Sequence, residues 1–419
     1  MLNTRSRMDA IQAPIIAVIG DVIRQHPGTI SLGQGVVHYG PPQAALDAAR
    51  AALPQPETHG YQDGAGIPQL LAAIEAKLQR DNGIRLRATE STSASAGQVR
   101  LRATEPAGAS AGQVGGSRVM VTAGGNMAFV HAILAITQPG DEVILPVPFY
   151  FNHEMAIQMA DCAAVRVPTD DRYQLDLDAI RRAITPRTRA IVTVSPNNPT
   201  GAVFPEAALR EVNTLCARHG LFHISDEVYE YFTYGSAVHA SPGGFDGAHA
   251  HTISMFSLSK AYGFAGWRIG YMVYPERLHE AIAKVQDTVL VCPPVLSQIA
   301  AVAAMEAGPA YCRPHVQSLA AVRDIVLSEL RDLEPLCTVP PAEGAFYCFL
   351  RVNADVEPFP IAERLIREHG VAIVPGDAFG ATKGCYFRIA YGALQKATVA
   401  EGIGRLVGGL RQILTSSHP

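Results

Sequence analysis

The sequence predicts an α/β protein whose core is a mainly parallel β-sheet with helices on both faces. Strand-like apolar runs alternate with helix-like runs from about residue 119 to residue 273, an order typical of parallel sheets. Several of the apolar runs end in polar residues. Ligands of open α/β sheets sit at the carboxyl ends of the strands, so these polar residues are the first candidates for a functional site.

The first strand of this region is expected near Val119, followed by a glycine turn and a helix. Residues 119–140 carry no charged side chain, but Gly125, Asn126 and His131 interrupt the apolar run. A strand, turn and helix are therefore favoured over a membrane span. A helix that opens on glycine presents free backbone N–H groups, which bind phosphate. Gly125 and Asn126 are the predicted phosphate ligands.

Two later strands also end in polar residues. The apolar run at 190–194 enters a turn that contains Asn198, and the run at 221–225 ends on Asp226, followed by Tyr229. Turn formation alone could explain the Asn-Pro pair, and a strand-terminal Asp is often a helix N-cap. The alternative is a binding site for a ligand that contains a nitrogen ring. Asp226 would face the cationic ring nitrogen of this ligand, while Tyr229 and Asn198 would donate to an oxygen on the ring.

Lys260 lies among small residues and hydroxyls in the run 257–270, eight positions before Arg268. A lysine that caps a loop needs no such neighbours. A lysine that forms a Schiff base needs a partly desolvated site, together with groups that bind the anionic part of a cofactor. The cofactor pyridoxal 5′-phosphate forms a Schiff base with a lysine and carries an anionic phosphate, so it would explain both the lysine and its neighbours.

A second interpretation of this run is a serine hydrolase. Ser257-x-x-Lys260 fits the S-x-x-K pattern, in which Ser257 would form the acyl-enzyme and Lys260 would be its base. The companion motifs are different, because residues 225–227 read Ser-Asp-Glu instead of Ser-Asp-Asn and residues 382–384 read Thr-Lys-Gly instead of Lys-Thr-Gly. The hydrolase is therefore a remote alternative.

Taken together, the motifs resemble a known family. Asn198-Pro199-Thr200-Gly201, Asp226-x-x-Tyr229 and Ser257-x-Ser259-Lys260 with Arg268 occur in the order and at the separations of the class I/II aminotransferases. These enzymes belong to the pyridoxal phosphate superfamily of fold type I. The resemblance covers nearly the whole chain.

The resemblance implies a two-domain architecture. The large domain, with a mainly parallel seven-stranded sheet covered by helices, would span residues 46–310. The smaller α+β domain would combine residues 1–45 with residues 311–419. In it, we expect a helix near residues 316–333 and strands near residues 345–350 and 386–389.

The resemblance also implies a role for each motif residue. Lys260 would bind pyridoxal phosphate covalently and act with Asp226 and Tyr229 in catalysis. The phosphate would be held by Gly125, Asn126, Ser257, Ser259 and Arg268, and the ring by Asp226, Tyr229, Asn198 and the stacked Tyr150. The substrate would contact Gly35, Asn198 and Arg388, whose guanidinium would form a bidentate fork with the α-carboxylate. Tyr61 would reach the phosphate of the partner subunit, so we expect a homodimer with shared active sites.

The implied reaction is the ping-pong transfer of an amino group between an amino acid and a 2-keto acid. Two positions that carry a cation in aspartate-specific members are neutral here, Asn126 and the region of Cys292. A second carboxylate would then be buried without a partner. The runs 149–159 and 229–232 also resemble plant-type aromatic and methionine aminotransferases, so methionine or an aromatic amino acid is the expected donor.

Three alternatives stay open on the same scaffold. An aspartate aminotransferase is possible if an arginine from elsewhere, such as Arg24 or Arg313, supplies the missing cation. A C–S lyase and a cyclase differ from an aminotransferase in side-chain placement and not in the core motif.

Composition excludes several other classes of protein. The 419 residues include 34 basic and 38 acidic side chains, for a net charge of -4, so neither a nucleic-acid partner nor a membrane surface is expected. The seven cysteines form no C-x-x-C pair, which is typical of reduced cytoplasmic proteins and predicts neither disulfides nor a metal site. No apolar signal segment follows the first residues, so cytoplasmic localisation is expected.

One segment departs from the family pattern. Residues 85–99 are repeated almost verbatim as residues 100–114, and both copies are rich in Ala, Ser, Thr and Gly. This composition lacks the apolar stripe that would bury one face. We therefore expect a mobile surface insertion at residues 85–118 without a catalytic role, or else an arm that binds a partner.

Overall fold

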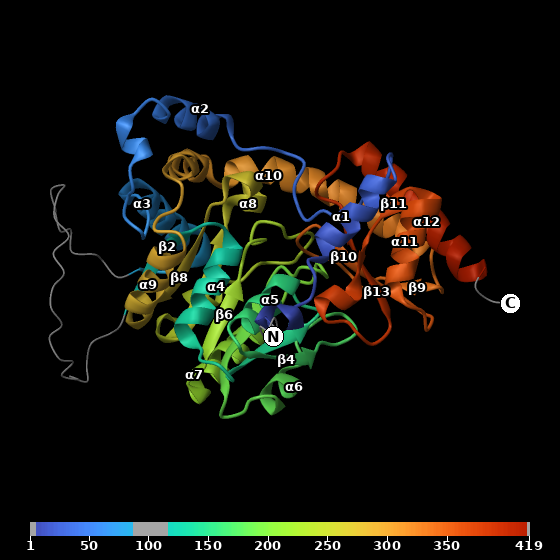
Figure 1. The fold of residues 1–419 in the computed structure, drawn as a ribbon, viewed down its shortest axis with the longest axis horizontal. Helices are drawn as coiled ribbons and strands as arrows, with labels where there is room; N and C mark the ends of the chain where they lie inside the picture. The colour runs from blue at the N-terminus through green and yellow to red at the C-terminus, as the bar shows by residue number, and fades with distance from the viewer. Residues whose placement is uncertain (1–5, 87–115, 417–419) are drawn as a thin grey trace, which may run out of the picture.

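The computed structural model describes residues 6–86 and 116–416. Most of the duplicated segment falls outside these ranges, so its predicted mobility is not addressed by the structure. Figure 1 shows a central sheet flanked by helices, with the C-terminal elements packed on one side of it.

The central sheet has seven strands in the order β2-β8-β7-β6-β5-β3-β4. Its strands are β2 Ser117–Thr122, β3 Glu142–Val147, β4 Ala163–Pro168, β5 Thr188–Val194, β6 Phe222–Asp226, β7 Thr252–Ser257 and β8 Gly270–Pro275. All neighbours run parallel except β8, which is antiparallel to both β2 and β7. The predicted fold class, a mainly parallel seven-stranded sheet with a second smaller sheet, is confirmed.

Helices cover both faces of this sheet, because both faces are apolar. On β3, Val143 and Leu145 point into one cluster and Ile144 into another, as the two-residue period of a strand requires. Against the first face pack α4 Gly125–Ile136, α5 Phe151–Met159 and α9 His279–Val289; against the other pack α3 Pro68–Lys77, α6 Leu177–Arg182, α7 Glu206–His219 and part of α10 Val295–Arg331.

A smaller antiparallel sheet has the order β12-β13-β10-β9. Its strands are β9 Cys337–Thr338, β10 Tyr347–Val352, β12 Val374–Pro375 and β13 Cys385–Ala390. A further pair joins β1 Ile30–Ser31 in parallel to β11 Val371–Ala372. Around these strands lie α1 Ile15–Gln25, α11 Pro358–His369 and α12 Lys396–Ser416, whereas α2 Gln43–Ala52 packs on α10.

Two elements of this region differ from their expected bounds. The helix expected at 316–333 is the second half of α10, which is interrupted at Gly308 (φ 59°, ψ −158°) and contains two prolines, residues that remove a backbone donor. The strand expected at 345–350 begins two residues later, because Ala345 has a φ of 53° and cannot extend the strand.

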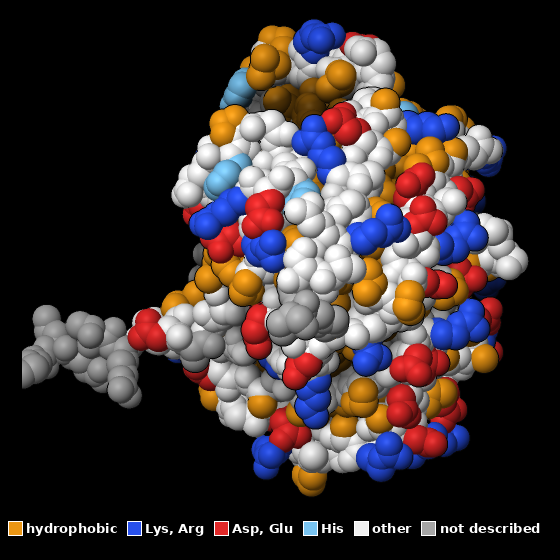
Figure 2. Space-filling view, turned by 90° about the vertical axis from the view of Figure 1, so that its right-hand side faces the viewer, with side chains coloured by type: hydrophobic (Ala, Val, Ile, Leu, Met, Phe, Trp, Pro, Cys, Tyr) orange, Lys and Arg blue, Asp and Glu red, His pale blue; other side chains and the backbone are white. Residues whose placement is uncertain are grey.

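Shorter helical turns connect the main elements. They are η1 Arg7–Ala10, η2 Pro56–His59, the π-turn η3 Leu78–Asn82, η4 Pro242–Gly244, η5 Ala248–Ala250, η6 Ala265–Trp267, η7 Glu276–Leu278 and η8 Gly376–Phe379, with the four-residue α8 Leu258–Ala261. Within the described ranges, no helix combines the length and hydropathy needed to span a membrane. The face shown in Figure 2 carries cations and anions interspersed, without a large patch of one sign.

His223 on β6 is fully buried between polar partners. Its ring nitrogens contact Thr193 Oγ1 at 2.9 Å and Asn213 Nδ2 at 3.1 Å. Since Asn213 donates to Nδ1, Nε2 carries the proton of the neutral ring. Burial, with a smaller effect of His251, lowers the pKa of His223 from 6.5 to about 3.

We therefore predict a loss of stability in mild acid. The unfolded chain binds a proton at His223 below pH 6.5 and the folded chain does not until about pH 3. The free energy of unfolding should fall by about 1.4 kcal/mol per pH unit within this window because of His223 alone. Urea unfolding at pH 7, 6 and 5 measures the slope. The His223→Gln variant, which cannot bind the proton, should show a shallower slope, and equal slopes would contradict the prediction.

Candidate active site

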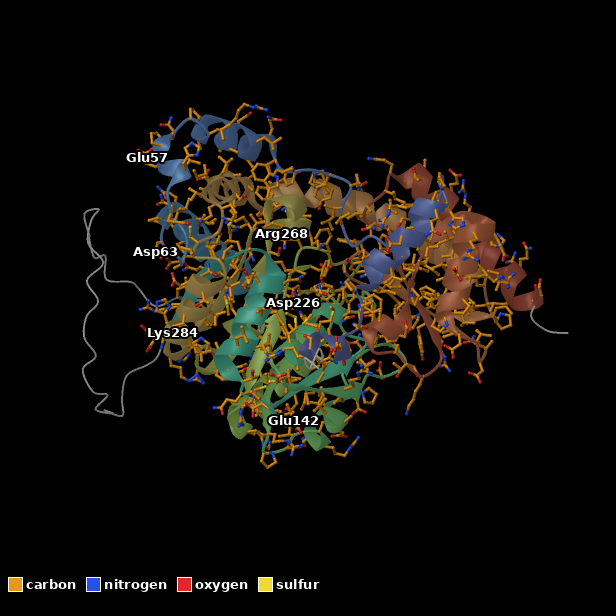
Figure 3. All side chains as sticks on the ribbon, viewed as in Figure 1. Glu57, Asp63, Glu142, Asp226, Arg268 and Lys284 are labelled. Atoms are coloured by element: carbon orange, nitrogen blue, oxygen red, sulfur yellow. The ribbon has the colours of Figure 1, made fainter. Side chains whose placement is uncertain are left out.

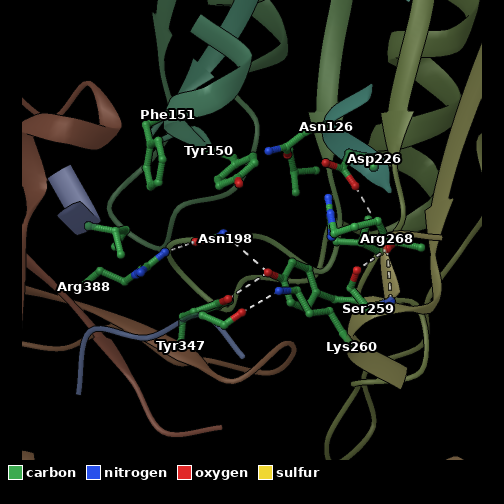
Figure 4. A pocket seen from close by; sticks show the side chains of 17 residues that line it. Asn126, Tyr150, Phe151, Asn198, Asp226, Ser259, Lys260, Arg268, Tyr347 and Arg388 are labelled. Carbon is green, nitrogen blue, oxygen red and sulfur yellow. Dashed lines mark hydrogen bonds between the residues drawn. The ribbon is translucent and has the colours of Figure 1, made fainter. Parts of the chain in front are cut away.

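A cavity of about 220 Å³ opens at the carboxyl ends of the central strands, between the two sheets. Asp226 and Arg268 lie near the middle of the molecule, whereas Glu57 and Lys284 lie at its periphery (Figure 3). All of the predicted site residues except Tyr61 line the cavity: Gly35, Gly125, Asn126, Tyr150, Asn198, Asp226, Tyr229, Ser257, Ser259, Lys260, Arg268 and Arg388. Figure 4 shows their side chains converging from both sheets.

Lys260 is held by the short helix α8, which begins directly after β7. The Ser257 hydroxyl caps this helix by accepting from the Ser259 N–H. Burial is the main cause that lowers the pKa of Lys260 to about 8; the cations Arg388 and Arg268 act in the same direction, and Asp226 opposes them. Its Nζ donates to the carbonyl of Gly35 at 2.5 Å. An amine with this pKa is partly unprotonated near neutral pH, so it can act as a nucleophile or a base.

Asp226 ends β6 and turns its carboxylate toward the cavity. His153 Nε2 lies 3.1 Å from Asp226 Oδ2, and the Val228 N–H donates to Oδ1 at 3.3 Å. His153 is itself buried and stacks on Phe129 with ring centroids 4.1 Å apart. The carboxylate therefore has a fixed direction, as a partner for a cationic nitrogen requires. His153 was not among the predicted site residues, because its only signal in the sequence is its position one helical turn after Tyr150.

Hydrogen-bond donors gather at the other end of the cavity, around the start of α4. Gly124 has a φ of 82°, and a Cβ there would lie 2.5 Å from Arg268 Nη2, so only glycine allows this approach. Arg268 donates to the carbonyls of Ala265 and Ala123, and in the described part of the chain it pairs with no carboxylate. Together with the Ser257 and Ser259 hydroxyls and the free N–H groups of α4, it forms a site suited to phosphate.

Arg388 comes from β13, an inner strand of the smaller sheet, and is 2% exposed. It donates to Asn198 Oδ1 at 3.0 Å and to the carbonyl of Gly33 at 2.7 Å. The rings of Tyr347 and Phe379 flank the guanidinium at 4.8 and 4.9 Å. Among the described residues no carboxylate pairs with it, and a buried cation without a counter-ion favours an anionic ligand.

The hydroxyl groups of Tyr229 and Tyr150 each contact an asparagine side chain. Asn198 Nδ2 lies 3.5 Å from the Tyr229 hydroxyl, and Asn152 donates to the Tyr150 hydroxyl at 2.8 Å. Tyr61, in contrast, is 84% exposed and does not line the cavity of its own chain. Five further lining residues were not predicted from the sequence: Ile16, Phe151, Val194, Val228 and Tyr347. They lie in apolar runs, which do not distinguish a cavity wall from the core.

Comparisons with known proteins agree with this geometry. Residues 27–406 match the family model described as aminotransferase class I and II. The aromatic aminotransferase ISS1 of Arabidopsis thaliana is 32% identical over 412 residues, which cover 96% of this chain and 94% of that protein. The aspartate/prephenate aminotransferase of Thermus thermophilus is 34% identical over 365 residues, covering 85% and 86%.

Solved structures show the same similarity. The aspartate aminotransferase of Thermus thermophilus with maleate has a TM-score of 0.82 and 30% identity, with 98% of this chain and all of that chain covered. The chain therefore belongs to the class I and II aminotransferases. It is an enzyme that transfers amino groups, and the predicted resemblance to a plant aromatic aminotransferase is confirmed.

Proposed function

We propose that this enzyme uses pyridoxal 5′-phosphate to move the amino group of methionine or an aromatic amino acid to a 2-keto acid in a ping-pong reaction. The observation that carries the proposal is the convergence of the Lys260 amine, the Asp226 carboxylate and the Arg388 guanidinium on one cavity. Each group matches one part of the reaction: proton movement, the ring nitrogen of the cofactor and the substrate carboxylate.

The cavity residues fit the cofactor. The phosphate would be held by Gly125, Asn126, Ser257, Ser259 and Arg268, the ring nitrogen by Asp226 and the ring oxygen by Asn198 and Tyr229. Tyr150 would cover one face of the ring. The fit rests on two arginines that pair with no carboxylate among the described residues. Arg388 is buried, and Arg268 lines the cavity together with Ser257 and Ser259. When bound, the cofactor supplies the electron withdrawal that makes the substrate's α-proton acidic.

The protein's own groups would then do the following work. Arg388 binds and orients the α-carboxylate. Lys260, whose pKa is about 8, takes up and returns the proton of the α-carbon. Asp226, held by His153, would face the ring nitrogen.

The serine-hydrolase alternative lacks its central contact. Ser257 Oγ donates to Ser259 Oγ at 2.9 Å, whereas Lys260 Nζ donates to the carbonyl of Gly35. Neither contact places the lysine as a base for Ser257. Among the described contacts, Ser257 thus lacks the lysine base of the S-x-x-K pattern.

A neutral substrate side chain is supported by the charges that line the cavity. These are Asp226, Lys260, Arg268 and Arg388, and each is assigned to the cofactor or the α-carboxylate. The remaining wall includes the apolar Ile16 and Phe151. Arg24, Cys292 and Arg313 do not line the cavity, and Arg24 pairs with Asp21 on the surface.

A panel of amino donors tests the substrate proposal. We expect the cofactor-loaded enzyme to lose its visible absorbance at least about 10-fold more efficiently with methionine, phenylalanine or tyrosine than with aspartate or glutamate, because a second carboxylate would be buried unpaired. Single-turnover absorbance measures each specificity constant. The Ile16→Arg variant should lower the preference for neutral over acidic amino donors, because its guanidinium could pair with the second carboxylate. A tenfold preference for aspartate would overturn the neutral-pocket argument, and release of ammonia without transfer would favour elimination.

We also propose a homodimer in which Tyr61 completes the phosphate site of the partner subunit. The support is the position of Tyr61, which is 84% exposed and lies outside the cavity of its own chain, so its ring is accessible to a second subunit. Light scattering of the active enzyme should give twice the mass of the chain. A fully active monomer would contradict the proposal.

Two further proposals concern organisation and location. We place the domain boundaries at residues 45/46 and 310/311, and the interruption of α10 at Gly308 supports the second of them; limited proteolysis would test both. We place the protein in the cytoplasm, because its seven cysteines are unpaired, as in a reducing compartment. Cell fractionation would test the location.

A further inference from the structure

Tyr347 touches two groups of the site at once. It lies at the start of β10 and is fully buried, with its hydroxyl 2.8 Å from that of Tyr229. Its ring face lies 4.8 Å from Arg388 Cζ. A Cβ on Gly35 would lie 2.7 Å from the Tyr347 hydroxyl, so the glycine leaves space for this side chain. The hydroxyl therefore has little freedom to move.

The other hydrogen bonds of the site determine whether the Tyr229 or the Tyr347 hydroxyl donates in their mutual contact. Arg388 donates to Asn198 Oδ1 at 3.0 Å, so the amide nitrogen of Asn198 must face Tyr229. In the described part of the chain, Tyr229 is the one acceptor within reach of the Tyr347 proton. The Tyr229 oxygen thus accepts from Asn198 and Tyr347, which uses both of its lone pairs. Its own proton is then free to point into the cavity, which Tyr229 lines.

We propose that Tyr347 is a positioning residue, whose hydroxyl directs the Tyr229 proton into the cavity while its ring holds Arg388. The proposal rests on the proposed function, since the acceptor for that proton would be the ring oxygen of the cofactor. One side chain would then support both the cofactor contact and the substrate-carboxylate contact.

Both tyrosines keep their protons at neutral pH. Burial raises the pKa of Tyr347 to about 12, although Arg388 opposes this shift. Burial also raises the pKa of Tyr229 well above its usual value of 10, and the neighbouring Tyr347 adds to the effect. The other titratable groups that act on Tyr229 are Tyr150 and Arg388. Tyr229 is therefore a donor and not an anion when a ligand oxygen approaches.

The test is the pH midpoint at which the visible spectrum of the bound cofactor changes. A donor aimed at the ring oxygen stabilises the form with one proton fewer, and so lowers this midpoint. Tyr347→Phe keeps the ring over Arg388 but removes the hydroxyl. We expect the midpoint to rise by about 0.5 to 1 pH unit, the size of one hydrogen bond, with KM for the amino donor changed less than about 3-fold.

Three variants make the interpretation specific. Tyr347→Leu, which also removes the ring, should raise KM in addition, because Arg388 loses its support. Tyr391→Phe, at an equally buried tyrosine outside the cavity, should leave the midpoint unchanged. Because both hydroxyls act through one contact, Tyr229→Phe combined with Tyr347→Phe should match Tyr229→Phe alone.

The outcomes separate the proposal from the proposed function. A wild-type protein that binds no pyridoxal phosphate would overturn the function itself. A wild-type midpoint that is unchanged in Tyr347→Phe would overturn only the role of Tyr347. If Tyr347→Phe does not fold, Gly35→Ala provides the same test, since its methyl group would displace the hydroxyl. An unchanged midpoint in that variant would overturn the proposal as well.

Discussion

Replacement of Lys260 by alanine is expected to lower the turnover number by about 10⁴-fold or more. The variant loses both the amine that would hold the cofactor and the group that would move the α-proton, and proton transfer alone contributes about 10² to 10⁴-fold. The purified variant should also lose the visible absorbance that borohydride converts into a covalent label at residue 260. Steady-state rates and mass spectrometry of the reduced protein measure both effects.

Two variants control this experiment. Lys260→Arg keeps a cation but not a free amine, because arginine stays protonated, and it should be as inactive as Lys260→Ala. Lys284→Ala removes a lysine that is 73% exposed on α9, and its activity should remain within 2-fold of the wild type. Retained labelling in Lys260→Ala would identify a different attachment site and contradict the assignment.

Replacement of Arg388 by lysine should lower kcat/KM by about 100-fold, mainly through a higher KM. Lysine keeps the charge but cannot form the two parallel hydrogen bonds of a guanidinium with a carboxylate. It also cannot maintain both contacts of Arg388, to Asn198 Oδ1 and to the carbonyl of Gly33. The measurement is kcat/KM for an amino acid compared with the corresponding amine, which lacks the carboxylate.

The wild type should strongly prefer the amino acid, and Arg388→Lys should lose most of that preference. Arg351→Lys is the matched control, because Arg351 lies on the neighbouring strand β10 with its side chain exposed. Its preference should be unchanged. If the two variants behave alike, Arg388 does not bind the α-carboxylate.

The sequence by itself determined the main fold class and most of the candidate site. The apolar runs follow from the geometry of the strand. A strand with one covered face buries every second side chain, and a strand covered on both faces buries nearly all of them. Asp226 ends β6, while Lys260 and Asn198 lie a few residues beyond the ends of β7 and β5, so local pattern and family spacing were enough to single them out. The glycine turn before α4 was visible for the same reason, since only glycine allows the observed φ of 82° at Gly124.

Only the tertiary structure decided which distant side chains meet. Arg388 contacts Asn198 across 190 positions of the chain, and Tyr347 contacts Tyr229 across 118. His153 and Asp226 meet because α5 packs beside the end of β6. Contacts of this kind depend on the packing of whole helices and sheets, which leaves no periodic signal in either segment. The partners that orient the candidate catalytic groups therefore became visible only once the two sheets were placed against each other.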